Sequence, residues 1–179
     1  MNKKSRRVVA GAAMAAALTI GGPVNADVAV FDDAGDVSSS VDIQRVRVDN
    51  GETDPGRIRV RVVQDDLLIG DEVTVYLDLR PRDPGPEWKV TGRPAAEWAL
   101  LRVERWHGRV RDVPCGAGSM RIDEVRDVTR LVLPFSCLEV SPRRVRVAVK
   151  VTRDDPVAAD WAPAFRTFLP WVPVSVPDR

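Results

Sequence analysis

Apolar and charged residues alternate along most of this chain after residue 46. In the segment 57–62, every second side chain is Ile or Val and the residues between them are arginines. Segment 145–151 repeats the pattern, with a valine at every second position. Because successive side chains of a strand point to opposite faces, this alternation predicts strands with one buried and one solvated face. After residue 26, no segment keeps the apolar stripe, with a period of about 3.6 residues, that an amphipathic helix needs.

The predicted strands are separated by segments rich in turn residues. Glycine, proline and aspartate gather in segments 50–56, 81–86 and 115–118. The strands expected from the alternation are 46–48, 57–62, 73–79, 98–103, 128–133 and 145–151, and a single helical turn is expected near 134–138. Roughly seven to ten short strands, spaced about 8–12 residues apart, are typical of two packed sheets. The sequence therefore predicts an all-β fold, an antiparallel β-sandwich of jelly-roll or immunoglobulin-like type.

The N-terminus has the layout of an export signal. Four cationic residues, Lys3, Lys4, Arg6 and Arg7, precede the uncharged apolar run 8–20, and Ala26 ends a small-residue cleavage site. A membrane anchor is the alternative, but segment 21–23 breaks the run after about 13 residues, whereas a spanning helix needs about 20. We expect residues 1–26 to be a signal peptide, of general secretory or twin-arginine type, and residues 27–179 to be one secreted domain.

The charge balance argues against nucleic acid as a partner. The expected signal peptide contains four cationic side chains and no acid, in a chain with 27 Lys and Arg against 26 Asp and Glu. Acids therefore exceed bases in the remaining domain, and its arginines alternate with acids instead of forming one positive cluster. Once the signal is removed, no membrane partner is expected either.

The chain has two cysteines, Cys115 and Cys137. In an oxidising compartment, an even pair with no competing thiol is expected to form one disulfide. The alternative is a zinc site, but these two residues lie far apart in the sequence and only His107 is available as a further soft ligand. We therefore expect a disulfide that closes a loop of about 23 residues.

Short phrases spread over the chain carry a family resemblance. These are Asp36-Val37, Asp42-Ile43 and the segments 75–78, 84–87 and 160–163. They resemble a group of uncharacterised small secreted β-sandwich proteins from high-GC Gram-positive bacteria. The layout, an early acidic turn followed by an Asp-Ile strand start, is also similar to family 9 carbohydrate-binding modules. That similarity implies a sandwich that binds sugars on aromatic platforms, often with a structural calcium ion, and it assigns no individual sugar-binding residue.

An early acidic cluster is a candidate calcium site. It consists of Asp32, Asp33, Asp36 and Asp42, with Asp154 and Asp155 as later contributors if the two ends of the chain meet. Calcium takes about six to eight oxygen ligands from carboxylates and carbonyls, but the spacing here does not match an EF-hand. The alternative is that these residues are solvated turn acids, since Asp adopts turn conformations readily. No other cofactor is expected.

The five tryptophans are the candidates for stacking on sugar rings. Trp88 is the first choice for a ligand-facing ring because it follows Pro86 and Glu87 at the end of a loop, although aromatic rings more often fill a core. The segment from about 160 to 179 places Trp161 and Trp171 among prolines, which cannot donate to a strand ladder. We expect this Pro/Trp-rich tail to cover an edge or a face of the sandwich.

The arginines of two neighbouring strands form rows on one face of a predicted sheet. They are Arg45, Arg47, Arg57, Arg59 and Arg61. Guanidinium groups in a row could recognise an anionic polymer through forked hydrogen bonds. The alternative is an ordinary solvent face on which acids of adjacent strands offset the charge.

The sequence favours binding over catalysis. A Ser-His-Asp triad would have to use His107, which looks like a hairpin tip, and no nucleophile-elbow motif precedes a helix. A glycosidase needs two carboxylates, and no pair stands out. We therefore expect a non-catalytic module that binds a carbohydrate or cell-wall polymer. An extracellular module that binds a cell-surface protein, or has a structural role, is the alternative, and a hydrolase is the third.

Overall fold

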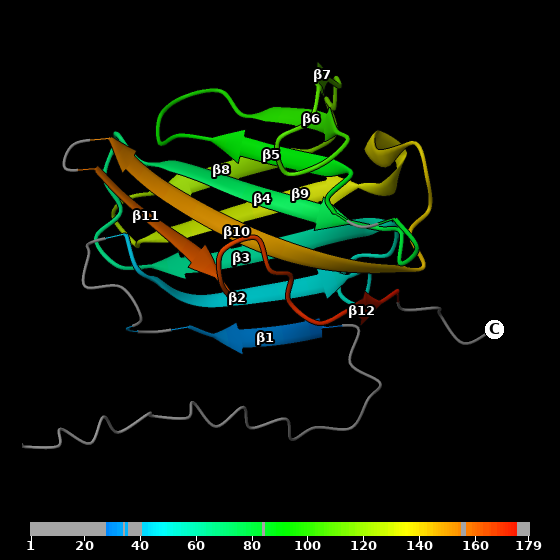
Figure 1. Cartoon of the computed structure of the whole chain (residues 1–179), viewed down its shortest axis with the longest axis horizontal. Helices are drawn as coiled ribbons and strands as arrows, with labels where there is room; N and C mark the ends of the chain where they lie inside the picture. The colour runs from blue at the N-terminus through cyan, green and yellow to red at the C-terminus, as the bar shows by residue number, and fades with distance from the viewer. Residues whose placement is uncertain (1–27, 34, 36–40, 84, 155–156, 175–179) are drawn as a thin grey trace, which may run out of the picture.

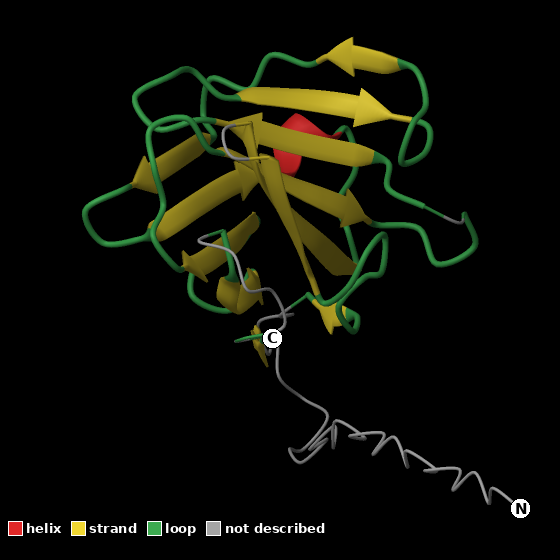
Figure 2. Ribbon diagram, turned by 60° about the vertical axis from the view of Figure 1, so that its left-hand side comes forward, coloured by secondary structure: helices red, strands yellow, loops and turns green. Residues whose placement is uncertain are grey.

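The computed structural model describes residues 28–33, 35, 41–83, 85–154 and 157–174. The expected signal peptide and Asp36 lie outside these residues. Two antiparallel sheets pack against each other as a sandwich (Figure 1), which confirms the predicted fold class. The four-residue 3-10 turn η1 (Phe135–Leu138), red in Figure 2, confirms the helical turn expected near 134–138.

The first sheet contains five strands in the order β1-β2-β3-β9-β8. Their bounds are β1 (Val28–Asp32), β2 (Ile43–Asn50), β3 (Arg57–Gln64), β9 (Val128–Pro134) and β8 (Ser119–Asp123). Strands β1, β2 and β3 follow one another along the chain, whereas β9 joins β3 after the chain has passed through the other sheet and returned.

The second sheet has the order β11-β10-β4-β5-β6-β7. Its strands are β11 (Val157–Ala162), β10 (Arg144–Asp154), β4 (Glu72–Asp78), β5 (Trp88–Gly92), β6 (Ala99–Val103) and β7 (Val110–Asp112). The short β12 (Val172–Pro173) also pairs with β10, next to β11 along the same edge. The C-terminal segment thus covers an edge of the sandwich, as predicted, but it does so partly as strand.

The core lies between the two sheets and is built by the alternating residues. Val46 and Val48 of β2 are fully buried, and so are the valines of β10 at every second position from 145 to 151. The arginines between them point outward, because successive side chains of a strand alternate between the two faces of its sheet. The predicted single apolar layer is confirmed.

Polar and covalent links close both edges of the sandwich. On one side, Cys115 lies in the crossover from β7 to β8 and forms the predicted disulfide with Cys137 of η1. On the other side, the buried Asp160 carboxylate of β11 accepts the amide N–H of Ile43 at 2.6 Å. At the other end of β2, the buried Asn50 side chain donates to the carbonyl of Val172 at 3.1 Å. The late part of the chain therefore joins the start of the first sheet.

The six strands expected from the alternation are all present, and the described residues contain six further strands to which no segment had been assigned, twelve in all against the seven to ten expected. The additional ones are β1, β5, β7, β8, β11 and β12, most of them short or at a sheet edge. An edge strand has one paired side only, so its sequence needs less regular alternation than a central strand. Within the described residues, no helix is long or apolar enough to cross a bilayer.

Candidate functional site

Aromatic rings gather on the outer face of the second sheet. Tyr76 of β4 points away from the core because its neighbours Val75 and Leu77 point into it. The strand register places Trp161 of β11 on the same face. The Tyr76 and Trp161 ring centroids are 5.6 Å apart and the ring planes differ by 9°, so the two rings stack.

Two loops bring further rings to this pair. Loop 104–109, between β6 and β7, carries Trp106, whose ring centroid lies 4.9 Å from that of Tyr76. Loop 163–171, between β11 and β12, carries Phe165, Phe168 and Trp171, and it crosses in front of β10 (Figure 1). We call the resulting set the aromatic surface: Tyr76, Trp106, Trp161, Phe165, Phe168 and Trp171.

Hydrogen bonds hold loop 163–171 on the sheet. The amide of Leu169 donates to the carbonyl of Val147 on β10 at 2.8 Å, midway between the pairings of β11 and β12. The side chains of Arg166 and His107 contact each other and so join the two loops. The loop therefore follows the edge of β10, with Leu169 buried in the core and its aromatic side chains over the outer face of the sheet.

Cationic side chains lie against these rings. The guanidinium carbon of Arg146 is 4.6 Å from the ring centroids of both Phe168 and Trp171. Asp78 holds Arg146 in this position, because its buried carboxylate accepts a hydrogen bond from Nε of Arg146 at 2.7 Å. Arg144 lies 4.9 Å from the Trp171 ring and Arg166 lies 4.5 Å from the Phe165 ring. Cation–π contacts of this kind orient the rings and leave N–H groups available to a ligand.

The aromatic surface is partly open to solvent. Tyr76 forms its floor and is 8% exposed, and this burial raises the pKa of its hydroxyl. Phe165 is 64% exposed at the rim. Trp106, Trp161, Phe168 and Trp171 are half-buried. Apolar ring area therefore remains accessible outside the core.

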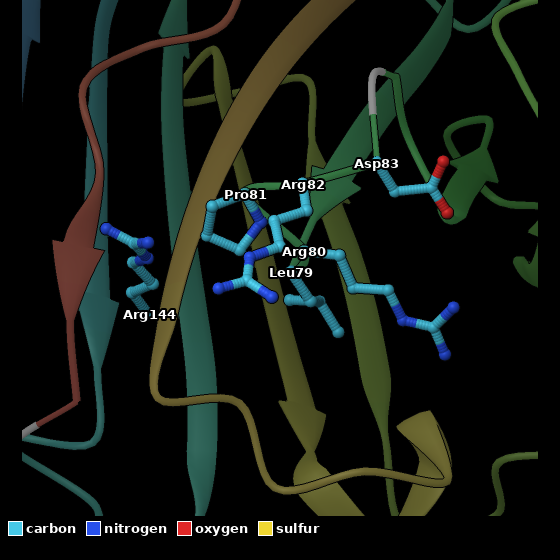
Figure 3. A pocket seen from close by; sticks show the side chains of 6 residues that line it. All are labelled: Leu79, Arg80, Pro81, Arg82, Asp83 and Arg144. Atoms are coloured by element: carbon cyan, nitrogen blue, oxygen red, sulfur yellow. The ribbon is translucent and has the colours of Figure 1, made fainter.

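A basic hollow of about 550 Å³ adjoins this surface. It is lined by Leu79, Arg80, Pro81, Arg82, Asp83 and Arg144. Figure 3 shows Arg144 on one side of the β10 ribbon and Arg80 with Asp83 on the other. Because Arg144 also contacts the Trp171 ring, one guanidinium group belongs to both the hollow and the aromatic surface.

Trp88 does not form the ligand platform that was expected of it. Its side chain is 3% exposed and belongs to the core, with the guanidinium carbon of Arg102 at 5.8 Å from the ring. The reason is register: Trp88 pairs with Leu77, and both residues point inward. The expectation for Trp88 was therefore wrong, and the accessible rings are those of the aromatic surface.

The acidic residues of the candidate calcium site have other neighbours. Asp32 pairs with Arg45, and Asp154 lies 3.8 Å from Arg93. The buried Asp42 carboxylate accepts the amide N–H of Gly35 at 3.0 Å. Among the described residues, no three potential metal ligands come together; Asp36 and Asp155 lie outside that part of the chain.

Glu87 is a titratable group that the sequence did not single out. Burial raises the pKa of its carboxyl to about 7, and the nearby Asp78 adds to the shift. One of its oxygens accepts the amide N–H of Leu79 at 2.8 Å, while the other is buried without a hydrogen-bond partner among the described residues. In the folded state, the Glu87 carboxyl is therefore mainly neutral at pH values below about 7.

The folded protein is expected to lose stability as the pH rises from about 4.5 to about 7, because Glu87 holds its proton more tightly when folded than when unfolded. Above that window its contribution should be constant. Glu87→Gln, which is neutral at every pH, should flatten this slope and be more stable than the wild type at pH 8. Thermal unfolding across the range tests this, with the exposed Glu124→Gln as control. An unchanged slope in Glu87→Gln would refute the assignment.

Nothing in the sequence indicates that the rings of the aromatic surface come together. Trp106 lies in a hairpin loop, Trp161 on an edge strand and Phe168 in an irregular segment, so no shared spacing linked them. The prolines around Trp161 and Trp171 indicated only that this segment covers an edge or a face of the sandwich. No protein-family model and no curated protein matches the chain. The function is therefore inferred from the chemistry of the site.

Proposed function

We propose that this protein is a secreted, non-catalytic β-sandwich that binds a carbohydrate or cell-wall polymer on its aromatic surface. The observation that supports this most is the gathering of six aromatic side chains outside the core, with cations against them. Aromatic rings offer large, rigid apolar faces that suit the C–H faces of sugar rings. The guanidinium groups of Arg144 and Arg166 would donate hydrogen bonds to sugar hydroxyls at the rim.

Secretion is supported by the signal-like residues 1–26 and by the disulfide. A disulfide persists in oxidising compartments and is rare in the cytosol. His107 is exposed on loop 104–109 and contacts Arg166, so it joins the two loops that carry most rings of the aromatic surface.

Phe165→Ala and Trp106→Ala are each expected to weaken polymer binding about tenfold, because each removes a ring from the surface that would contact the sugar. Affinity electrophoresis in gels that contain purified wall polysaccharides or soluble plant glucans provides the measurement. Val157→Ala is the matched control, since this side chain is 90% exposed on β11 but lies outside the aromatic surface. Retardation by no polymer, or an equal loss in the control, would count against the proposal.

A second candidate function is supported by one end of the sandwich, at the left in Figure 1. The loops there expose the apolar residues Leu68, Ile69 and Val125, and the first residue of β11 exposes Val157. The loops are joined, because Leu67 donates its N–H to Asp127 at 2.8 Å and Arg153 donates to the Asp66 carbonyl at 2.6 Å. Such a rigid apolar end suits a protein partner. A partner retained from culture supernatant despite excess glycan, and lost with Ile69→Asp, would support this alternative.

A further inference from the structure

The outer face of the first sheet carries a row of four arginines. The register pairs Arg47 with Arg61, Arg61 with Arg130, and Arg130 with Arg121, across β2, β3, β9 and β8. All four side chains are exposed. Since neighbouring strands lie about 4.8 Å apart, this arginine row (Arg47, Arg61, Arg121 and Arg130) extends over about 14 Å, with one guanidinium group on each strand.

The charges of the arginine row are not neutralised within the described part of the chain. Other arginines on the same face do have acidic partners: Arg45 pairs with Asp32, and Arg59 pairs with Asp54 at 2.6 Å. Among the described residues, no member of the row forms an ion pair or a side-chain hydrogen bond. Like charges directly opposite each other destabilise a sheet, so this arrangement has a cost that a bound anion would offset.

The positive charge is confined to a single line. On one side, the neighbouring row runs from Asp32 through Arg45, Val63 and Val128 to Asp123. On the other side, Asp49 occupies the next outward position of β2, opposite Arg59. A hollow of about 350 Å³ lies along the line, with Arg47, Arg61 and Arg130 in its lining. The unpaired positive charge therefore follows one line, and a carboxylate lies beside each end of it, Asp49 next to Arg47 and Asp123 next to Arg121.

We propose that the arginine row binds a linear acidic polysaccharide that carries a carboxylate on its sugar residues. Guanidinium forks match carboxylates in a bidentate geometry, and an extended chain of charged sugars can follow a line of regularly spaced cations. A nucleic-acid duplex or an anionic membrane would also bring negative charge against the acids beside the row, which would repel it. A single nucleic-acid strand needs rings for its bases to stack on, and the outward positions next to the row hold no aromatic residue.

Polygalacturonate is the probe, and its fully methyl-esterified form is the neutral comparison. At low salt we expect polygalacturonate alone to bind, and Arg61→Gln and Arg130→Gln each to weaken binding about fivefold. The slope of log affinity against log salt should fall by about one for each arginine removed. Arg45→Gln is the matched control, because it makes the same charge change on the same face at an arginine that Asp32 already neutralises.

Three outcomes would overturn the inference. These are no binding at low salt, an equal loss in Arg45→Gln, or tighter binding of a single-stranded oligonucleotide of matched charge. Thermal unfolding checks that the variants fold; exposed Arg→Gln changes should leave the unfolding temperature unchanged or raise it by relieving repulsion. The inference is independent of the aromatic surface, which lies on the other sheet, so Phe165→Ala should leave polygalacturonate binding intact.

Discussion

Replacing Arg153 with Met is expected to lower the free energy of unfolding by about 3–5 kcal/mol. Arg153 is 5% exposed and forms two hydrogen bonds of 2.7 Å to the carboxylate of Asp71, which is fully buried. These bonds also hold the pKa of the Arg153 guanidinium above its usual value. The substitution would leave the Asp71 charge buried without its partner, which costs much more than the lost attraction alone.

The same pair anchors the loop between β3 and β4. The Asp71 carboxylate accepts the amide N–H of Leu68 at 2.8 Å, and Arg153 donates to the Asp66 carbonyl at 2.6 Å. Local unfolding of this loop should therefore accompany the loss of stability. Urea denaturation measures the free energy, and hydrogen exchange of residues 65–71 reports the local effect.

Two comparison variants separate the buried pair from surface charge. Arg93→Met removes an exposed pair with Glu72, at 3.5 Å, and should cost less than about 1 kcal/mol. The double variant Arg153→Met with Asp71→Leu should recover much of the lost stability, because no unpaired charge stays buried. If Arg153→Met lowered the free energy of unfolding as little as Arg93→Met does, the Arg153–Asp71 pair would not contribute the predicted stability.

Removing the disulfide with Cys115→Ala and Cys137→Ala is expected to lower the free energy of unfolding by about 3 kcal/mol. The two residues are separated by 22 positions, so the cross-link restricts a loop of moderate length in the unfolded chain. In the folded state it ties the crossover between β7 and β8 to η1 after β9. Without it, one edge of the sandwich loses its covalent link between the sheets.

Reductant provides the internal control for this prediction. Treatment of the wild type should reproduce the stability of the double variant, whereas the double variant itself should not respond. Intact mass after alkylation without reduction should show no modified cysteine. Two free thiols in the native protein, or a double variant as stable as the wild type, would contradict the prediction.

The candidate sites differ in how far the sequence could predict them. Arg47 and Arg61 lie on strands joined by a short turn, so their place on one face followed from the alternation. Arg130 and Arg121 complete the row from strands that reach this sheet only after the chain has crossed to the other one and back. Neither the length of the row nor the pairing of Arg45 and Arg59 with acids could be deduced beforehand.

For the aromatic residues too, the sequence did not predict which side chains meet. Trp88 was chosen from its position after a proline-containing loop, yet its pairing with Leu77 turns it into the core. Trp106 and Phe168 lie in irregular loops, and alternation predicts the direction of a side chain only within a strand. Their meeting over Tyr76 depends on the packing of both loops on the second sheet.

Alternation of apolar and charged residues was sufficient to predict that this chain forms strands, which face of each expected strand points into the core, and that two sheets share one apolar layer. The two cysteines likewise specified their own bond. Tertiary structure alone decided which strands are neighbours and therefore which outward side chains meet. The physical reason is that strands pair through backbone hydrogen bonds, which are the same for nearly every residue, so an alternating pattern determines the face of a side chain but not the strand beside it.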